Sequence, residues 1–184
     1  MHPEILSISL FWFVTAYTPG PNNVVASYSG FNFGITRTIP HILGVTFGFT
    51  SLVIFLTIGL VNVFKLYPAI QIIIKYLGTL FLVYLAYKIA SSTASKDTQK
   101  DNPVKFIETF LFQYLNPKGV MVAIIVVSTY VELGENYFNY AFQIIALAFL
   151  FSLTSITLWT FVGKFLRKFA TNDKFIKSFN YAMS

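Results

Sequence analysis

The stretch Thr18-Pro19-Gly20-Pro21-Asn22-Asn23 interrupts an otherwise apolar part of the chain, with Ile5–Tyr17 before it and Val24–Tyr28 after it. Two prolines and a glycine in three successive positions cannot continue a helix, because proline lacks the backbone N–H and clashes with the preceding turn. Both flanks are too apolar for a water-exposed loop. We therefore expect a helix broken at membrane depth, where protein or a water-filled cavity must satisfy the freed backbone groups. Such a break predicts a binding site.

The composition is typical of an integral membrane protein. Of the 184 residues, 55% are hydrophobic and 11% are charged, whereas a soluble domain carries about 25% charged residues. The mean hydropathy is +0.66, and the 18% of aromatic residues suits lipid-facing surface and interfacial belts. The absence of cysteine excludes disulfides and cysteine-based metal sites. The net charge of +6 does not indicate nucleic acid as a partner, because the basic residues lie between apolar runs.

The apolar runs predict an all-α, polytopic bundle of transmembrane helices that forms a single domain over residues 1–184. A helix needs about 20 apolar residues to cross a bilayer, and five spans are expected, at about 5–30, 42–64, 69–90, 105–131 and 140–162. The first span is broken at Thr18–Asn23 and the fourth at Asn116-Pro117-Lys118-Gly119. The start of the chain has no basic region, so we expect the first span to be retained.

The segments between the spans predict the orientation. Between the first two spans, residues 30–34 and Arg37 are expected to form a turn that Pro40 ends, with His41 at the surface. Residues 91–103 read as a solvated linker. With the N-terminus outside, the inside segments hold ten Lys and Arg and the outside segments hold Lys65 alone. This bias predicts a multi-pass protein of the bacterial inner membrane with its N-terminus outside.

The two breaks also indicate an internal repeat. Pro19 and Pro117 are 98 positions apart, and the same offset moves the second span, 42–64, onto the fifth, 140–162. It moves the third span past the end of the chain. We expect two three-helix repeats, inverted in the membrane, over about 3–90 and 104–184, with helices 1 and 4 broken and the sixth helix truncated. The alternative is that apolar spans with short loops simply recur at regular intervals.

The chemistry of the breaks suits an anionic group. Pro21 and Pro117 each fit the first position of a helix, and Asn116 is a good N-cap. The first helical turns would leave backbone N–H groups unpaired, those of Asn22, Asn23, Val24, Lys118, Gly119 and Val120. Each helix N-terminus carries about half a positive charge. Two such ends that converge near the midplane, together with the Lys118 ammonium, predict a carboxylate site.

An amino acid matches the remaining groups at the breaks. The Asn22 and Asn23 amides both donate and accept hydrogen bonds, and the carbonyls of Ala16 and Tyr17 could accept from an ammonium. The breaks therefore supply the candidate substrate-binding residues, Thr18, Pro19, Gly20, Pro21, Asn22, Asn23, Asn116, Pro117, Lys118 and Gly119. The alternatives are a purely structural kink at Pro19–Pro21, and a Lys118 that snorkels or bonds carbonyls.

Other polar and small residues have more ordinary interpretations. Glu108 could carry a coupling proton, although an acid at the start of a helix is the commoner arrangement. Lys75 is better explained as snorkelling to an interface. Gly44 and Gly48 form a small-xxx-small pair expected to pack helices closely. No metal-ligand spacing, phosphate loop or nucleophile motif occurs in the sequence, so no metal, cofactor or enzyme activity is expected.

The chain resembles the LysE/RhtB family of bacterial inner-membrane exporters of amino acids and their derivatives. The resemblance rests on the order and spacing of the residues Thr18–Asn23, Gly30, Gly34, Arg37, Gly44, Gly48, Gly78 within Tyr76–Leu80, Tyr84–Lys88 and Asn116–Gly119. It implies a six-helix exporter driven by the proton gradient, and it assigns the site to Pro19, Gly20, Pro21, Asn22, Asn23, Asn116, Pro117 and Lys118. Family members handle lysine, arginine, threonine, homoserine, cysteine or O-acetylserine, so the resemblance leaves the substrate open.

The sequence departs from the family at its end, where residues 179–184 resemble only the beginning of a sixth span. A homo-oligomer would be one way to supply the missing wall of the bundle. The leading hypothesis is a secondary exporter of a small amino acid that works by alternating access. The alternatives are a channel-like or regulatory membrane protein without coupled transport, favoured by the few acidic residues in the spans, and an inactive truncated remnant.

Overall fold

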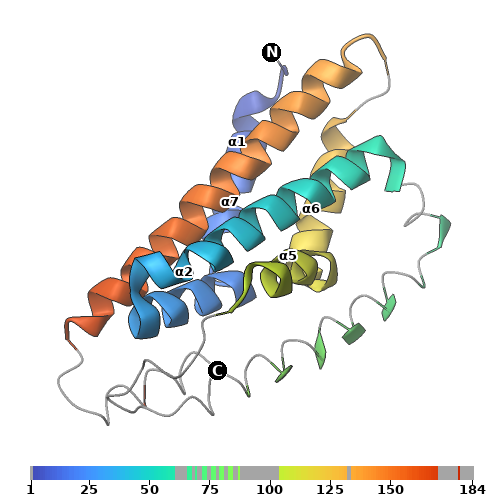
Figure 1. Cartoon of the computed structure of the whole chain (residues 1–184). Helices are drawn as coiled ribbons and strands as arrows, with labels where there is room; N and C mark the ends of the chain where they lie inside the picture. Colours follow the sequence, from blue (N-terminus) through green and yellow to red (C-terminus); the bar gives the residue numbers. More distant parts are fainter. Residues whose placement is uncertain are drawn as a thin grey trace.

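The computed structural model describes residues 2–60, 104–131 and 134–169, with isolated positions between 66 and 87 and residue 178. All regular elements in these residues are helical, which confirms the all-α class for them (Figure 1). The elements are α1 (Ile5–Tyr17), α2 (Pro21–Phe55), the π-helical turn η1 (Leu56–Leu60), α5 (Phe106–Leu115), α6 (Pro117–Tyr130) and α7 (Tyr137–Arg167).

Two described helical runs are long and apolar enough to cross a membrane, Pro21–Gly59 and α7. The helices α5 and α6 are bent by 61° relative to each other, and they make a third membrane span if the pair is counted as one broken span. Helix α1 is shorter than a span. Most of the expected third span, the linker 91–103 and nearly all of the chain after residue 169 lie outside the described residues. The inverted repeat, the N-terminus-out orientation and the homo-oligomer therefore stay predictions.

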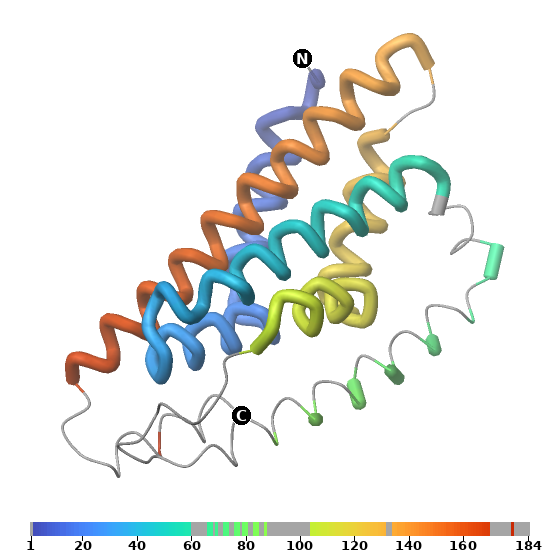
Figure 2. The backbone as a smooth tube through the Cα atoms, in the orientation of Figure 1, coloured from blue at the N-terminus to red at the C-terminus, as the bar shows by residue number. Residues whose placement is uncertain are grey.

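Helix α2 is folded back on itself at Gly34. The backbone there has φ 76° and ψ 178°, a conformation that only glycine adopts readily. Two arms result, residues 21–33 and 35–55, and the tube in Figure 2 doubles back between them. The hydroxyl oxygens of Ser29 and Thr38 are 2.8 Å apart across the arms. The arms therefore lie side by side.

The fold-back corrects the expected turn. The turn is confined to Gly34, and Pro40, expected to end it, lies inside the second arm. Proline is tolerated there because the carbonyl that it cannot bond belongs to Thr36, an exposed residue in the first turn of that arm. The prediction that His41 lies at the surface is wrong. Its side chain is only 1% exposed, because the second arm begins before it and presents it to the first arm.

Close helix crossings hold the bundle together. Helices α2 and α7 make the most extensive contact among the described elements and lie side by side in Figure 1. A Cβ atom at Gly30 would clash with the Thr160 backbone, and one at Gly163 would clash with the Ser27 backbone. On the second arm of α2, Gly48 would meet the Phe110 carbonyl oxygen of α5 at 2.6 Å. Small residues at these crossings permit direct backbone contact.

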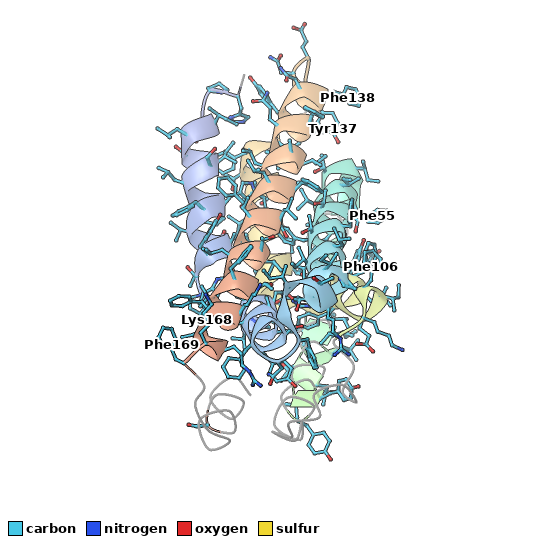
Figure 3. All side chains as sticks on the ribbon, turned by 60° about the vertical axis from the view of Figure 1, so that its left-hand side comes forward. Phe55, Phe106, Tyr137, Phe138, Lys168 and Phe169 are labelled. Atoms are coloured by element: carbon cyan, nitrogen blue, oxygen red, sulfur yellow. The ribbon has the colours of Figure 1, made fainter. Side chains whose placement is uncertain are left out.

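The main apolar core joins α1, α2, η1, α6 and α7. Its fully buried members include Ile8, Trp12, Leu52, Val53, Leu56, Val126 and Ile144. At the ends of α7, Figure 3 shows Tyr137 and Phe138 near one tip and Phe169 near the other. A helix of 31 residues is about 46 Å long, so these rings are separated by about the thickness of a bilayer with its headgroups. Aromatic rings at both ends are typical of membrane interfaces.

Candidate functional site

Each break follows directly from its local sequence. Helix α1 ends at Tyr17, Thr18 and Gly20 have extended backbone, and Pro21 is the first residue of α2. Helix α5 ends at Leu115, Asn116 is extended, and Pro117 is the first residue of α6. Proline suits the first position of a helix because its missing N–H would have no partner there. Both prolines therefore restart a helix, as the sequence predicts.

The structure brings the two breaks together. The Lys118 ammonium donates to the Thr18 carbonyl at 2.9 Å and lies 3.5 Å from the Pro19 carbonyl oxygen. Gly20 lies alongside the lysine, since a Cβ there would be 3.1 Å from both the Cδ and Nζ atoms of Lys118. The lysine of the second break thus binds the carbonyls of the first, the bonding that the sequence left open as an alternative role for Lys118.

Asn23 closes the first break. Its amide nitrogen donates to the carbonyls of Ala16 at 2.8 Å and Thr18 at 2.9 Å. The Ser155 hydroxyl of α7 also donates to the Ala16 carbonyl, at 2.7 Å. The Ala16 carbonyl was expected to accept from a substrate ammonium, but side chains of the protein already occupy it. In addition, the N–H of Val24, expected to be unpaired, donates to the Gly20 carbonyl at 2.9 Å.

The other asparagine of the first break, Asn22, joins this break to α5. The Asn22 amide donates to the Gln113 side chain at 2.7 Å, and the Gln113 amide donates back to Asn22 at 3.2 Å. Gln113 also donates to the Thr109 carbonyl at 2.7 Å. At the second break, the N–H of Val120, expected to be unpaired, donates to the Asn116 carbonyl at 2.9 Å. The reciprocal amide pair fixes both side chains, because each has a donor and an acceptor in use.

A cavity of about 80 Å³ lies between the breaks. Room for one water takes about 10–15 Å³, so this space suits a small molecule. Five helices line it, with polar side chains among apolar ones: Thr15, Asn22, Asn23, Gln113, Asn116, Lys118, Ser152 and Ser155, with Trp12, Phe49, Val122, Ala148, Phe151 and Ile156. The remaining lining comes from Ala16, Gly20, Pro21, Val45 and Gly119. Thr18, Pro19 and Pro117 are not in the lining, although Thr18 and Pro19 face Lys118.

Two buried polar atoms at this cavity lack a partner. The indole N–H of Trp12 and the amide oxygen of Asn116 make no hydrogen bond, although the two side chains are only 1% and 3% exposed. A buried polar group that is left unbonded costs about 1–3 kcal/mol. The cavity therefore offers one free donor and one free acceptor to a bound molecule.

The charge at the cavity is positive. Lys118 is the one charged side chain in its lining, and no carboxylate of the described residues borders it. Glu108 is at the start of α5, where its carboxylate accepts a hydrogen bond from the Lys105 N–H at 3.2 Å. This is the ordinary role of an acid at a helix start, the alternative to proton coupling that the sequence left open. The described part of the chain contains no cluster of His, Cys, Asp or Glu that could hold a metal ion.

The sequence did not single out Trp12, Gln113, Ser152 or Ser155, which all line the cavity. For Gln113 a signal was present, since it is an amide in an apolar run one helical turn before Asn116. Ser152 and Ser155 are three positions apart and hence share a face of α7. For Trp12 no signal was present, because a tryptophan in an apolar span normally serves packing or an interface.

The chain is similar to a known protein family and to individual bacterial proteins. The model of the family described as LysE type translocator matches residues 13–183. The cysteine/O-acetylserine efflux protein of Salmonella choleraesuis (strain SC-B67) is 29% identical over 172 residues, covering 91% of this chain and 87% of that protein. The cysteine/O-acetylserine efflux protein of Escherichia coli O1:K1 / APEC is 32% identical over 135 residues, covering 71% of this chain and 68% of that protein. No solved structure matches the chain.

Proposed function

The chain belongs to the LysE type translocator family, and on this premise we propose that it exports a small neutral amino acid or derivative, of the cysteine/O-acetylserine class, across the bacterial inner membrane. The family supports amino-acid export, and the similar efflux proteins point to this substrate class. The proposal includes the proton gradient as the driving force and an N-terminus on the outside.

The observation that carries the proposal is the cavity between the breaks, with one ammonium and no described carboxylate in its lining. Lys118 and the N-terminus of α6 suit the carboxylate of an amino acid. The unpartnered Asn116 oxygen suits its ammonium, and the Trp12 N–H remains for a side-chain acceptor. A lysine or arginine substrate would bring a second positive charge without a counter-charge. The charge balance therefore favours a neutral substrate over the basic ones that the sequence left open.

Transport requires the breaks to separate. In this structure the Lys118 ammonium is bonded to the Thr18 carbonyl. A substrate carboxylate competes for the same ammonium and forms the stronger bond, because both partners are then ionised. Substrate binding would then weaken the contact between the two breaks and allow one part of the bundle to move against the other, as in alternating access.

The proposed function predicts a selective export. Bacteria that express the protein should release O-acetylserine or cysteine at a rate at least about tenfold above cells with the empty vector, because the cavity is small and its charge is matched to a zwitterion. Lysine release should not change. The measurement is the amount of each amino acid in the medium over time, at verified levels of protein in the membrane. Failure to release any amino acid would contradict export, whereas equal release of lysine would contradict only the charge argument.

The unpartnered indole predicts a second effect. Trp12→Phe removes the N–H but keeps a ring that can pack against Phe49, whose ring lies 5.5 Å from that of Trp12. Loss of one hydrogen bond of about 1–1.5 kcal/mol should raise the substrate KM by about five- to tenfold. The matched control is Trp159→Phe, because Trp159 is the other tryptophan of the chain and does not line the cavity. An unchanged KM in Trp12→Phe would show that the indole does not bind substrate.

A further inference from the structure

His41 is the most buried ionisable side chain among the described His, Lys, Arg, Asp and Glu residues. It is 1% exposed, and the one other buried member of this set is His2, at 8%. His41 lies on the second arm of α2, in a run long and apolar enough to cross the membrane. An ionisable residue at such a place is costly to bury and usually functional.

The hydrogen bonding of His41 fixes its tautomer. The Nε2 atom lies 3.3 Å from the carbonyl oxygen of Asn22. A carbonyl can only accept, so Nε2 carries the hydrogen, and in the neutral ring Nδ1 is then the bare nitrogen. Nδ1 is buried and has no partner. The ring therefore presents an unused proton-accepting lone pair inside the bundle.

His41 is connected to the cavity by a single residue. Asn22, whose backbone accepts from His41, has its side chain in the reciprocal pair with Gln113. Both amides line the cavity. Asn22 also belongs to the first turn of α2, directly after the break. A change in the charge of His41 therefore acts on the helix end and on a cavity side chain together.

The other charged groups of the described elements around α2 are engaged or exposed. On α5 and its cap, Glu108 accepts from the Lys105 backbone. On α6, Lys118 binds the Thr18 carbonyl. On α7, the Arg167 guanidinium lies 5.2 Å from the centre of the Phe31 ring, and Lys164 is exposed. On α2 itself, Arg37 lies over Phe33 at 5.3 Å, and α1 contains no charged residue.

We propose that His41 carries the coupling proton of export, by binding a proton at Nδ1 when the cavity is empty and giving it up when substrate occupies the cavity. This inference rests on the proposed export function and replaces Glu108 as the coupling candidate. The protonated ring is an imidazolium, which donates a stronger bond to the Asn22 carbonyl and repels the substrate ammonium. Proton and substrate then occupy the protein in turn, and one proton moves inward as one substrate moves outward. The Nδ1–H bond forms with a proton taken from water on the outer side of the membrane, and it breaks when that proton is released to water on the inner side.

The test separates coupling from movement of the substrate. The full chain is reconstituted in liposomes, and uptake of labelled O-acetylserine is measured in two ways, as exchange against unlabelled O-acetylserine without a pH gradient and as accumulation driven by a pH gradient. His41→Gln keeps an amide donor for the Asn22 carbonyl but cannot take up a proton. We expect exchange to stay within about twofold of the wild type and gradient-driven accumulation to fall at least about tenfold.

His2→Gln is the matched control. His2 is the other buried histidine, and its Nε2 likewise lies by a backbone carbonyl, that of Tyr130, at 3.0 Å. Unlike His41, which bonds to the cavity residue Asn22, it has hydrogen-bond partners (Gln143, Tyr130 and Glu4) that do not line the cavity. It should retain both activities. Gradient-driven accumulation that persists in His41→Gln overturns the proposal, and so does a loss of exchange together with accumulation, which would mean a role in binding or folding.

The wild-type protein supplies a measurement that needs no variant to fold. In liposomes that contain a pH-sensitive dye, substrate flux should move protons in the opposite direction. Substrate flux without proton movement overturns the coupling role of His41 and supports uncoupled, channel-like transport. If the wild type moves no amino acid in any of these assays, the proposed function itself fails, a result distinct from a failure of the coupling role.

Discussion

Export should fall at least about tenfold when Lys118 is replaced by methionine. The ammonium is the one charge that lines the cavity, and it donates to the Thr18 carbonyl at 2.9 Å. Loss of a hydrogen bond to a charged group costs about 1.5–3 kcal/mol, which corresponds to about 10- to 150-fold in binding. Methionine keeps an unbranched apolar side chain beside Gly20 and is shorter than lysine only by the terminal ammonium, so the loss reports mainly the charge. The measurement is O-acetylserine export at equal amounts of protein in the membrane.

Lys164→Met is the control, because Lys164 is an exposed lysine near the end of α7. It should export at the wild-type rate. A substrate analogue in which the carboxylate is converted to an amide separates two roles of Lys118. If the ammonium binds the carboxylate, the analogue should be handled equally poorly by the wild type and by Lys118→Met. A difference that persists with the amide would mean that Lys118 acts through the Thr18 carbonyl alone. Wild-type export by Lys118→Met would contradict both roles.

Gly163→Val should reduce the amount of folded protein in the membrane at least about tenfold. Even a Cβ at this position would clash with the Ser27 backbone of α2, and a backbone atom cannot rotate away as a side chain can. The crossing of α2 and α7 is the largest among the described elements, so its separation disturbs the whole bundle. Overpacking costs about 1–3 kcal/mol and occasionally more, and this clash belongs to the upper end. Size-exclusion chromatography of detergent-solubilised membranes gives the folded amount.

Gly119→Ala is the matched control for this prediction. A Cβ at Gly119 would have Asn116 Nδ2 at 3.4 Å and a Phe49 carbon at 3.5 Å as its nearest neighbours, which are ordinary contact distances. The folded amount of Gly119→Ala should therefore equal that of the wild type. A Gly163→Val protein that elutes as a single peak of wild-type size and amount would show that α2 and α7 can separate without loss of the fold.

The sequence predicted those features that depend on one residue and its neighbours. Pro21 and Pro117 begin helices because proline suits the first position of a helix and disrupts most interior positions. The helical class and the family also follow from such local patterns. Periodicity does not reveal which atoms meet when segments 98 positions apart are brought together. The bond from Lys118 to the Thr18 carbonyl and the pairing of Asn22 with Gln113 could therefore not be assigned beforehand.

The errors have a common physical origin. The prediction for His41 assumed that Pro40 ended a surface turn, but one glycine with positive φ makes the whole turn and the helix resumes at once. The carbonyl of Ala16 was treated as free because the helix ends there, whereas Asn23 and Ser155 both reach it. Trp12 was overlooked because its unpartnered N–H exists only once the core has closed around it. Each of these three features arises only from tertiary packing, which the local sequence does not reveal.

The bond from Lys118 to the Thr18 carbonyl also bears on how easily the two breaks can separate. A hydrogen bond to a charged group is worth about 1.5–3 kcal/mol, which corresponds to a ratio of about 10 to 150 between closed and opened forms. Thermal motion thus opens a small but steady fraction of molecules even without substrate. A carboxylate in place of the Thr18 carbonyl would have formed an ion pair in a low dielectric and held the breaks shut. In the proposed exporter, a neutral partner for Lys118 would hold the two breaks together and still allow them to separate during each transport cycle.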